Sequence, residues 1–166
     1  MGKYINSLKE TDLFYNLSQM QLEMVESLCE EVIFQQGEVV IAENSHDKEL
    51  YIILRGDAEV LINPGLVSPM QAVSAKMQKI ASLSRGQSFG EIALVDEGAR
   101  TATVRTTGKE TLMLKISRDR LLLLCTTYPE LGYKIMYNLA VDLANKIRNT
   151  DLRMRETMLY QKRNPD

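Results

Sequence analysis

Apolar residues recur with a helical period near both ends of the chain and in short strand-like runs between them. Near the N-terminus, Ser18 precedes Gln21 by three residues, which is the spacing of a capping box at the start of a helix. The apolar residues that follow fall on one helical face: Leu22, Val25, Leu28 and Cys29. This pattern predicts an N-terminal helix in the segment LSQMQLEMVESLCEEV.

From VIFQQGEVV to about Ile116, short runs of β-branched and aromatic residues are separated by Gly, Asp, Asn and Pro. The run LYIILRGDAEVLI predicts a hairpin around Gly56 and Asp57, and TATVRT with TLMLKI predicts a second around Gly108. QKIASLSRGQ predicts a further strand. Many short strands at close spacing are typical of a barrel or a double-sheet jelly roll. The segment 63–77 contains two prolines and is predicted to be a long surface loop, to which we assign no role.

A helical period returns after Ser117, and Pro129 suits the first turn of a new helix. The apolar stripe of this helix steps by threes and fours through Met136, Leu139, Leu143, Ile147, Thr150, Met154 and Met158. The pattern allows roughly thirty helical residues, or about 45 Å. A helix this long extends beyond a small barrel, so we expect a partner helix to cover its apolar stripe.

Composition narrows the class of protein. The chain has 166 residues, enough for one well-packed core, and a net charge of -2, which gives no basic field for nucleic acid. No stretch approaches the ~18 consecutive apolar residues of a membrane span, so we expect no membrane partner. Cys29 and Cys125 form no ligand or redox motif, which favours reduced thiols and a cytoplasmic location.

Catalytic chemistry finds no support in the sequence. The single histidine, His46, lies in the polar turn ENSHDKE, where a solvated side chain is the ordinary interpretation. We find no Ser-His-Asp set, no cluster of metal ligands and no pair of catalytic carboxylates. The sequence therefore predicts neither catalytic residues nor a metal site, and we expect a protein that is not an enzyme.

The stretch FGEIALVDEGARTATVRT, residues 89–106, combines groups that suit a sugar phosphate. Gly90 lets the backbone approach a ligand closely, and the short helical turn predicted after it presents free N–H groups to an anion. Arg100 offers a planar fork of donors that matches a phosphate, and Ala102 again allows close approach. Glu91 does not suit a phosphate, so we expect it to accept a hydrogen bond from a sugar hydroxyl. A ligand with a phosphate and a free ribose hydroxyl satisfies both residues.

This stretch resembles the phosphate-binding cassette of cyclic nucleotide-binding domains, the type found in the catabolite activator protein and in the regulatory subunit of cyclic-AMP-dependent protein kinase. VIFQQGEVVIAENSHDKELYIILRGDAEVLI and LSRGQSFGE also resemble the family, over roughly residues 10–150. The resemblance implies a mainly β fold with flanking helices: a double-stranded β-helix (jelly roll) barrel with N-terminal helices and a long C-terminal helix. It divides the chain into an N-terminal helical segment (1–30), the β-barrel (31–117) and the C-terminal helices (118–166).

The resemblance also implies roles for individual residues. Glu91 would bind the ribose 2′-hydroxyl and Arg100 the cyclic phosphate. Val60 and Ile80 would line the purine side, with Asn149 or Thr150 near the base. The remaining cassette residues implied in binding are Phe89, Gly90, Ile92, Ala93, Thr101 and Ala102. The open alternative is that Glu91 and Arg100 only pair with each other, in a nucleotide-free barrel that serves as a structural or protein-interaction dimerisation module.

The ligand expected from the resemblance is cyclic AMP or cyclic GMP. The hydroxyl of Thr101 can reach a guanine amino group, but relatives that prefer cyclic AMP also carry Thr or Ser there. Cyclic AMP is favoured because the sequence as a whole resembles bacterial members of the family.

The C-terminal helix resembles the family's dimerisation helix, which also caps the base. Its expected homodimer seam consists of Leu139, Leu143, Ile147 and Met154. The segment MRETMLYQKRNPD cannot contain a helix-turn-helix, so we expect no direct DNA binding. Two alternatives stay open for the output: an unidentified partner protein, or another part of a longer gene product of which this chain is a fragment.

Overall fold

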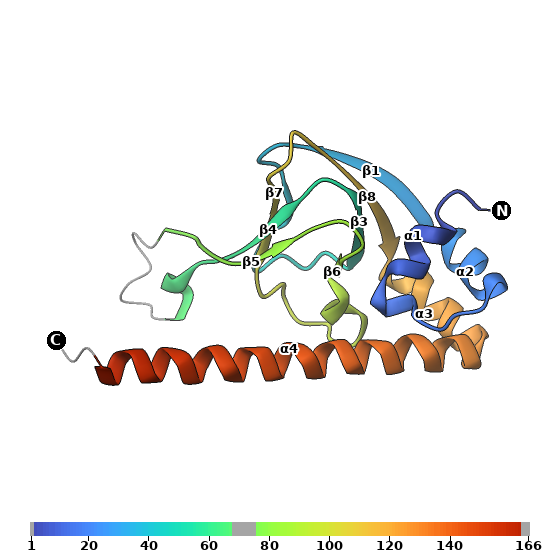
Figure 1. Ribbon diagram of the computed structural model, residues 1–166. Coiled ribbons are helices and arrows are strands. Elements are labelled where there is room, and N and C mark those ends of the chain that lie inside the picture. Colours follow the sequence, from blue (N-terminus) through green and yellow to red (C-terminus); the bar gives the residue numbers. More distant parts are fainter. Residues whose placement is uncertain (1, 68–75, 164–166) are drawn as a thin grey trace.

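The strands form two four-stranded antiparallel sheets, and helices flank them at both ends of the chain (Figure 1). One sheet has the order β1 (Cys29–Gln35), β8 (Glu110–Ser117), β3 (Glu49–Arg55) and β6 (Ser88–Phe89). The other has the order β2 (Val39–Ile41), β7 (Thr103–Thr106), β4 (Ala58–Ile62) and β5 (Gln78–Leu83). The structure is a computed structural model that describes residues 2–67 and 76–163. The predicted mainly β jelly roll with flanking helices is confirmed.

The two predicted hairpins are wrong, because the chain changes sheets at both turns. β3 continues into β4 through Gly56 and Asp57, yet β3 pairs with β6 and β8, whereas β4 pairs with β5 and β7. β7 and β8, which flank Gly108, also belong to different sheets. Gly56 has a φ of 88°, and a Cβ there would lie 2.7 Å from Oγ1 of Thr111. The N–H of Thr107 donates to the Asp57 carbonyl at 3.0 Å, so the two corners support each other.

The N-terminal segment forms α1 (Ile5–Glu10), the 3-10 turn η1 (Asp12–Phe14) and α2 (Gln19–Glu26). The capping box between Ser18 and Gln21 is confirmed. The predicted helix is too long, because α2 ends at Glu26 and Cys29 already begins β1. Cys29 pairs with Ile116 of β8 at the start of a seven-residue ladder, and these strand hydrogen bonds override the helical pattern of the sequence.

The core has two parts, which lie on opposite faces of the sheet that contains β3. Leu50 and Ile52 pack with the N-terminal helices and the C-terminal helices, while Tyr51 and Ile53 point into the space between the two sheets. This division follows from the alternation of side chains along a strand. Tyr51 stacks on Phe89 with ring centroids 5.4 Å apart, which fixes the strand that leads into the cassette.

Two helices follow β8: α3 (Arg118–Thr127) and the 35-residue α4 (Pro129–Arg163). Figure 1 shows α4 running along one side of the molecule, past the sheets and beneath the cassette. Its first part packs on the N-terminal segment, where Asn138 donates to the carbonyls of Leu13 and Tyr15 at 3.1 and 2.8 Å. The predicted long C-terminal helix is confirmed.

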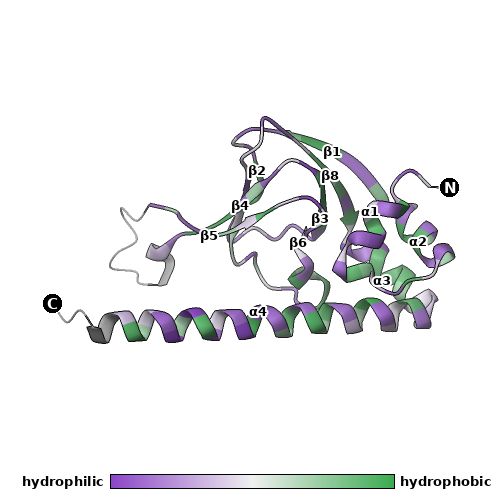
Figure 2. Cartoon of the chain, viewed as in Figure 1, coloured by the Kyte–Doolittle hydropathy of each residue, from purple (hydrophilic) through white to green (hydrophobic). Residues whose placement is uncertain are grey.

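The seam expected on α4 is partly wrong. Leu139 is only 1% exposed and belongs to the chain's own core, against which Leu143 also packs. An apolar stripe that faces solvent keeps Ile147 and Met154 of the expected seam but excludes Leu139, from which its members lie roughly 60–160° around the helix at 100° per residue. Its members are Tyr133, Tyr137, Val141, Ile147, Met154 and Met158. Apolar positions recur along the whole helix in Figure 2.

The segment 63–77, predicted to be a long surface loop, begins with the 3-10 turn η2 (Pro64–Val67). Residues 68–75 lie outside the described part of the chain.

Candidate functional site

A cavity of about 720 Å³ lies between the sheets, the cassette and α4. This volume falls within the ~300–1,000 Å³ of typical ligand pockets. All twelve residues that the sequence predicted for the site line this cavity: Val60, Ile80, Phe89, Gly90, Glu91, Ile92, Ala93, Arg100, Thr101, Ala102, Asn149 and Thr150. Whether they bind a nucleotide stays a prediction, but residues from four separate segments of the chain meet in one cavity.

The backbone at Gly90 turns sharply to begin the cassette. Gly90 has a φ of 83°, and the 3-10 turn η3 (Glu91–Leu94) follows it directly. A Cβ at Gly90 would lie 2.7 Å from the carbonyl oxygen of Glu49, so both the conformation and the packing require glycine. The expected short helical turn after Gly90 is confirmed.

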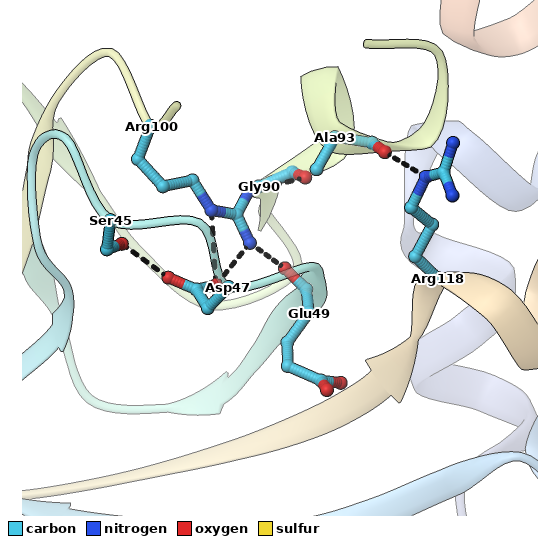
Figure 3. A network of polar contacts seen from close by, with 7 residues as sticks. All are labelled: Ser45, Asp47, Glu49, Gly90, Ala93, Arg100 and Arg118. Atoms are coloured by element: carbon cyan, nitrogen blue, oxygen red, sulfur yellow. Dashed lines mark hydrogen bonds and ion pairs between the residues drawn. The ribbon is translucent and has the colours of Figure 1, made fainter. Parts of the chain in front are cut away.

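Arg100 is a buried cation at one side of the cavity, with 8% of its surface exposed. Figure 3 shows its guanidinium between Asp47 and two backbone carbonyls. Nε and Nη2 donate to Oδ1 of Asp47 at 3.1 and 2.5 Å, Nη2 donates to the Glu49 carbonyl at 2.5 Å, and Nη1 donates to the Gly90 carbonyl at 2.9 Å. A guanidinium has five N–H donors, and these four bonds leave one N–H on Nη1 for another acceptor.

Asp47 sets the orientation of Arg100. Burial alone would raise the pKa of Asp47, but hydrogen bonds from Arg100 and Ser45 lower it overall. The Asp47 carboxylate is therefore ionised at neutral pH and partly neutralises the arginine. An anion that approaches Arg100 meets a guanidinium whose plane is already fixed.

Glu91 lies on the α4 side of the cavity and is only 4% exposed. Nζ of Lys146, on α4, donates to Oε1 of Glu91 and to Oδ2 of Asp142, the latter at 2.8 Å. Burial alone would lower the pKa of Lys146, but the carboxylates of Glu91 and Asp142 raise it overall, so the lysine stays charged. Among the described residues, Oε2 of Glu91 takes no hydrogen bond and can accept one from a ligand.

The alternative that Glu91 and Arg100 pair with each other is wrong. Arg100 pairs with Asp47 in the turn before β3, and Glu91 pairs with Lys146 on α4. The two ends of the cassette are thus fixed to different parts of the molecule.

The far end of the cavity combines apolar and polar groups. Val60 and Ile80 lie on neighbouring strands, and Asn149 and Thr150 approach from α4. Nη1 of Arg153, one turn further along α4, donates to the Ile80 carbonyl at 3.0 Å. This end of the cavity is therefore lined by apolar side chains from the strands and by polar side chains from α4.

The cyclic nucleotide-binding domain family matches residues 31–128, which is more than half of the chain. The chain belongs to this family. Its regulatory members include a cAMP-dependent protein kinase regulatory subunit from Mycosarcoma maydis, 31% identical over 105 residues that cover 63% of this chain and 18% of the relative. The cyclic AMP receptor protein of Thermus thermophilus is 24% identical over 147 residues, which cover 89% of this chain and 62% of the relative.

The fold agrees with this assignment. A cyclic nucleotide-binding domain from Methylobacillus flagellatus superposes with a TM-score of 0.78 at 22% identity, covering 93% of this chain and 84% of the other. The chain spans less than two thirds of the length of both curated relatives.

The family is defined by binding, and the two relatives are a regulatory subunit and a receptor by name. The chain is accordingly a binding domain and not an enzyme. Within residues 2–67 and 76–163, no group of His, Cys, Asp or Glu side chains is arranged to hold a metal ion. In the same residues, no helix is both long and apolar enough to cross a membrane.

Sequence reasoning missed three residues of this cyclic nucleotide-binding domain. Asp47 stands in the turn ENSHDKE, which drew attention only for its histidine. Lys146 and Arg153 lie on the polar side of the long helix, where charged residues are ordinary. The spacing of Lys146, Asn149, Thr150 and Arg153 by threes and fours was an available signal, because it places all four on one face.

Proposed function

We propose that this chain is a cyclic nucleotide sensor that binds cyclic AMP in preference to cyclic GMP and signals through movement of α4. The carrying observation is that one cavity joins Arg100, Glu91 and the cassette backbone to the middle of α4. In this proposal the phosphate meets Arg100 and the turn after Gly90, and the ribose hydroxyl meets Oε2 of Glu91. The base lies between the strands and α4.

The preference for cyclic AMP is supported by the names of the two relatives, both of which refer to that nucleotide. At the far end of the cavity, the Asn149 amide offers donors and an acceptor, and the Thr150 hydroxyl, which donates to the Lys146 carbonyl at 2.9 Å, offers an acceptor; this set suits the ring nitrogens and the amino group of adenine. We also retain as proposals the division at residues 30 and 117, the cytoplasmic location and an output through a partner protein.

Calorimetric titration with cyclic AMP and cyclic GMP tests the proposal. We expect saturable binding of both nucleotides, tighter for cyclic AMP, and no heat of binding with linear AMP at the same concentrations. One observation favours the alternative of a nucleotide-free dimerisation module: Arg100 and Glu91 both have partners within the chain. Absence of binding to either cyclic nucleotide would decide for that alternative.

The contact between Lys146 and Glu91 supports signalling through α4, because it joins the ribose side of the cassette directly to the helix. A ligand that engages Glu91 changes the surroundings of Lys146, and differential contacts of this kind shift conformational equilibria. Lys146 is half-exposed, so solvent screens the pair and its contribution stays modest.

Replacing Lys146 with glutamine is expected to weaken cyclic AMP binding on the order of fivefold (~1 kcal/mol), the upper range for a partly exposed ion pair. It should also reduce the ligand-dependent slowing of amide hydrogen exchange in residues 140–155. Arg148→Gln is the matched control, because among residues 2–67 and 76–163 the Arg148 side chain donates only to Asn145 of its own helix. Equal behaviour of the two variants would remove Lys146 from the signalling route.

The exposed apolar stripe of α4 supports a homodimer. Tyr133 and Ile147 are 69% and 63% exposed, and the stripe continues to Met158. A helix whose apolar residues face solvent over several turns is stabilised by a second helix that covers them. The second copy of this chain would bring the same stripe to the interface.

Val141→Glu and Ile147→Glu are expected to convert the dimer to monomers, measured by light scattering at micromolar concentration. The charge would be buried against an apolar helix face without a partner. Leu123→Glu is the control, since Leu123 is 68% exposed on α3 and lies off the stripe. Leu143→Glu is less informative, because Leu143 packs on its own core and its replacement also tests folding. A wild-type monomer at this concentration would contradict the dimer.

A further inference from the structure

Arg118, the first residue of α3, is a buried cation that lies behind the cassette rather than in the cavity. Its side chain is 13% exposed. Nε donates to the carbonyl oxygen of Ala93 at 2.5 Å, as Figure 3 shows. Nη2 lies 3.7 Å from Oε1 of Glu97, in the loop after η3, and Nη1 lies 3.2 Å from Oδ1 of Asp119. The guanidinium therefore contacts both η3 and the loop that leads to Arg100.

The hydrogen bond from Arg118 to the Ala93 carbonyl is made near the end of η3. The N–H groups of Val95 and Asp96 both donate to the Ile92 carbonyl, so Arg118 supplies a charged donor for the next carbonyl along. Carbonyls at the end of a helical turn need such partners, and a charged donor makes the bond stronger than a neutral one. The position of the Ala93 peptide is thereby tied to the start of α3.

The backbone of Arg118 continues this connection to the other side of the site. Its N–H donates to the Lys48 carbonyl at 3.1 Å. Lys48 stands between Asp47 and Glu49, which both accept hydrogen bonds from Arg100. One residue thus contacts the cassette through its side chain and the support of the phosphate-binding arginine through its backbone.

The two helices α3 and α4 are closely packed against each other where α4 begins. A Cβ on Gly132 of α4 would lie 2.5 Å from the Cys125 carbonyl of α3, so there is no space between the helices at this corner. The N–H of Gly132 also donates to the Tyr128 carbonyl at 2.9 Å. If α3 moves as a rigid helix, this contact near its end is expected to move the start of α4 with it.

We propose that Arg118 is a positioning residue that transmits the position of the cassette to α3 and the first half of α4. The proposal rests on the proposed function, because a nucleotide must move or fix the cassette. A ligand phosphate that draws the backbone around Ala93 toward it displaces the Ala93 carbonyl, and Arg118 follows. This route enters α4 at its beginning and is separate from the contact of Lys146 in the middle of the helix.

The test compares Arg118→Gln, Arg118→Lys and the control Arg120→Gln. Arg120 lies on the same helix, is half-exposed and pairs with Glu30 at 3.7 Å, away from the cassette. Cyclic AMP affinity is measured by calorimetry, and amide hydrogen exchange is measured with and without saturating nucleotide. The two regions compared are the cassette (89–102) and the helical region 118–143.

In the wild type, ligand should slow exchange in both regions. Arg118→Gln should bind roughly tenfold more weakly, within the usual range of coupling. At saturation it should keep the slowing in the cassette but lose most of it in 118–143. Arg118→Lys can still donate to Ala93 and should retain part of the effect, while Arg120→Gln should behave as the wild type.

Unchanged ligand-dependent exchange in 118–143 of Arg118→Gln would overturn the proposal, even if the variant melts at a lower temperature. A lower melting temperature alone would mean that Arg118 only stabilises the fold. If Arg118→Gln does not fold, full wild-type coupling in Arg118→Lys overturns the proposal instead. If the wild type binds neither cyclic nucleotide, both the proposed function and this inference are refuted. If the wild type binds normally and ligand-dependent exchange in 118–143 is unchanged in Arg118→Gln, this inference alone is refuted.

Discussion

Arg100→Ala is expected to weaken cyclic AMP binding at least about thirtyfold, since truncating one partner of a buried charged contact costs ~2–5 kcal/mol. Arg100 is the buried guanidinium of the cavity, and its donors are already oriented by Asp47 and by the carbonyls of Gly90 and Glu49. Removing it deletes the proposed phosphate contact and the hydrogen bond that joins the two ends of the cassette. Calorimetry with cyclic AMP measures the loss.

The variant must be shown to fold, because alanine also leaves two carbonyls and Asp47 without their donor. We expect a lower thermal midpoint and an unchanged circular dichroism spectrum. Arg105→Ala is the matched control: Nε and Nη2 of Arg105 contact Glu59 at 3.0 and 2.7 Å, the same pairing chemistry on β7, but Arg105 does not line the cavity. Arg100→Lys keeps the charge without the fork and should bind with intermediate affinity. A folded Arg100→Ala protein with wild-type affinity would contradict the assignment.

The sequence was sufficient for the strands but not for their pairing. Alternation of apolar residues predicts the strands on either side of Gly56, yet a glycine and aspartate between two strands look alike in a hairpin and in a corner between sheets. The corner at Gly56 is decided by its contact with Thr111, fifty-five residues away in the sequence. Only the three-dimensional arrangement supplies that information.

The same limit applies to the helices. Leu139 and Ile147 look equivalent in the apolar stripe, but the first is buried in the chain's own core and the second is exposed. The spacing of apolar residues along a helix does not show which of them are buried by the same chain and which stay exposed. Leu139 and Leu143 therefore had to be removed from the expected dimer seam, while Ile147 and Met154 stay in it.

Within the site, the residues predicted from the sequence are those whose chemistry is local. Gly90, Glu91 and Arg100 lie within eleven residues, so their combination points to a sugar phosphate without knowledge of the fold. Asp47 and Lys146 come from distant segments, and each becomes recognisable only when the fold brings it to the cassette. The partners that hold Arg100 and Glu91 are thus harder to predict than these two charged residues themselves.

Glu91→Gln is expected to remove most of the discrimination between cyclic AMP and its 2′-deoxy analogue. In the wild type, the Glu91 carboxylate should favour the ribose form by ~1.5–3 kcal/mol, the usual contribution of a hydrogen bond to a charged group, or at least about tenfold in affinity. An amide accepts a weaker bond, so the two nucleotides should bind the variant with affinities within a few-fold of each other. Calorimetry with both nucleotides gives the ratio for each protein.

The ion pair between Glu91 and Lys146 offers a second explanation if Glu91→Gln loses affinity for both nucleotides. Glu91→Gln leaves Lys146 with Asp142 as its remaining carboxylate, which could displace α4 and weaken both nucleotides alike. The double variant Glu91→Gln, Lys146→Gln removes that charge. We expect it to show the same low discrimination as Glu91→Gln alone, while Lys146→Gln keeps the wild-type ratio. If Glu91→Gln weakens both nucleotides equally and preserves their ratio, Glu91 serves to hold α4 and does not contact the ribose hydroxyl.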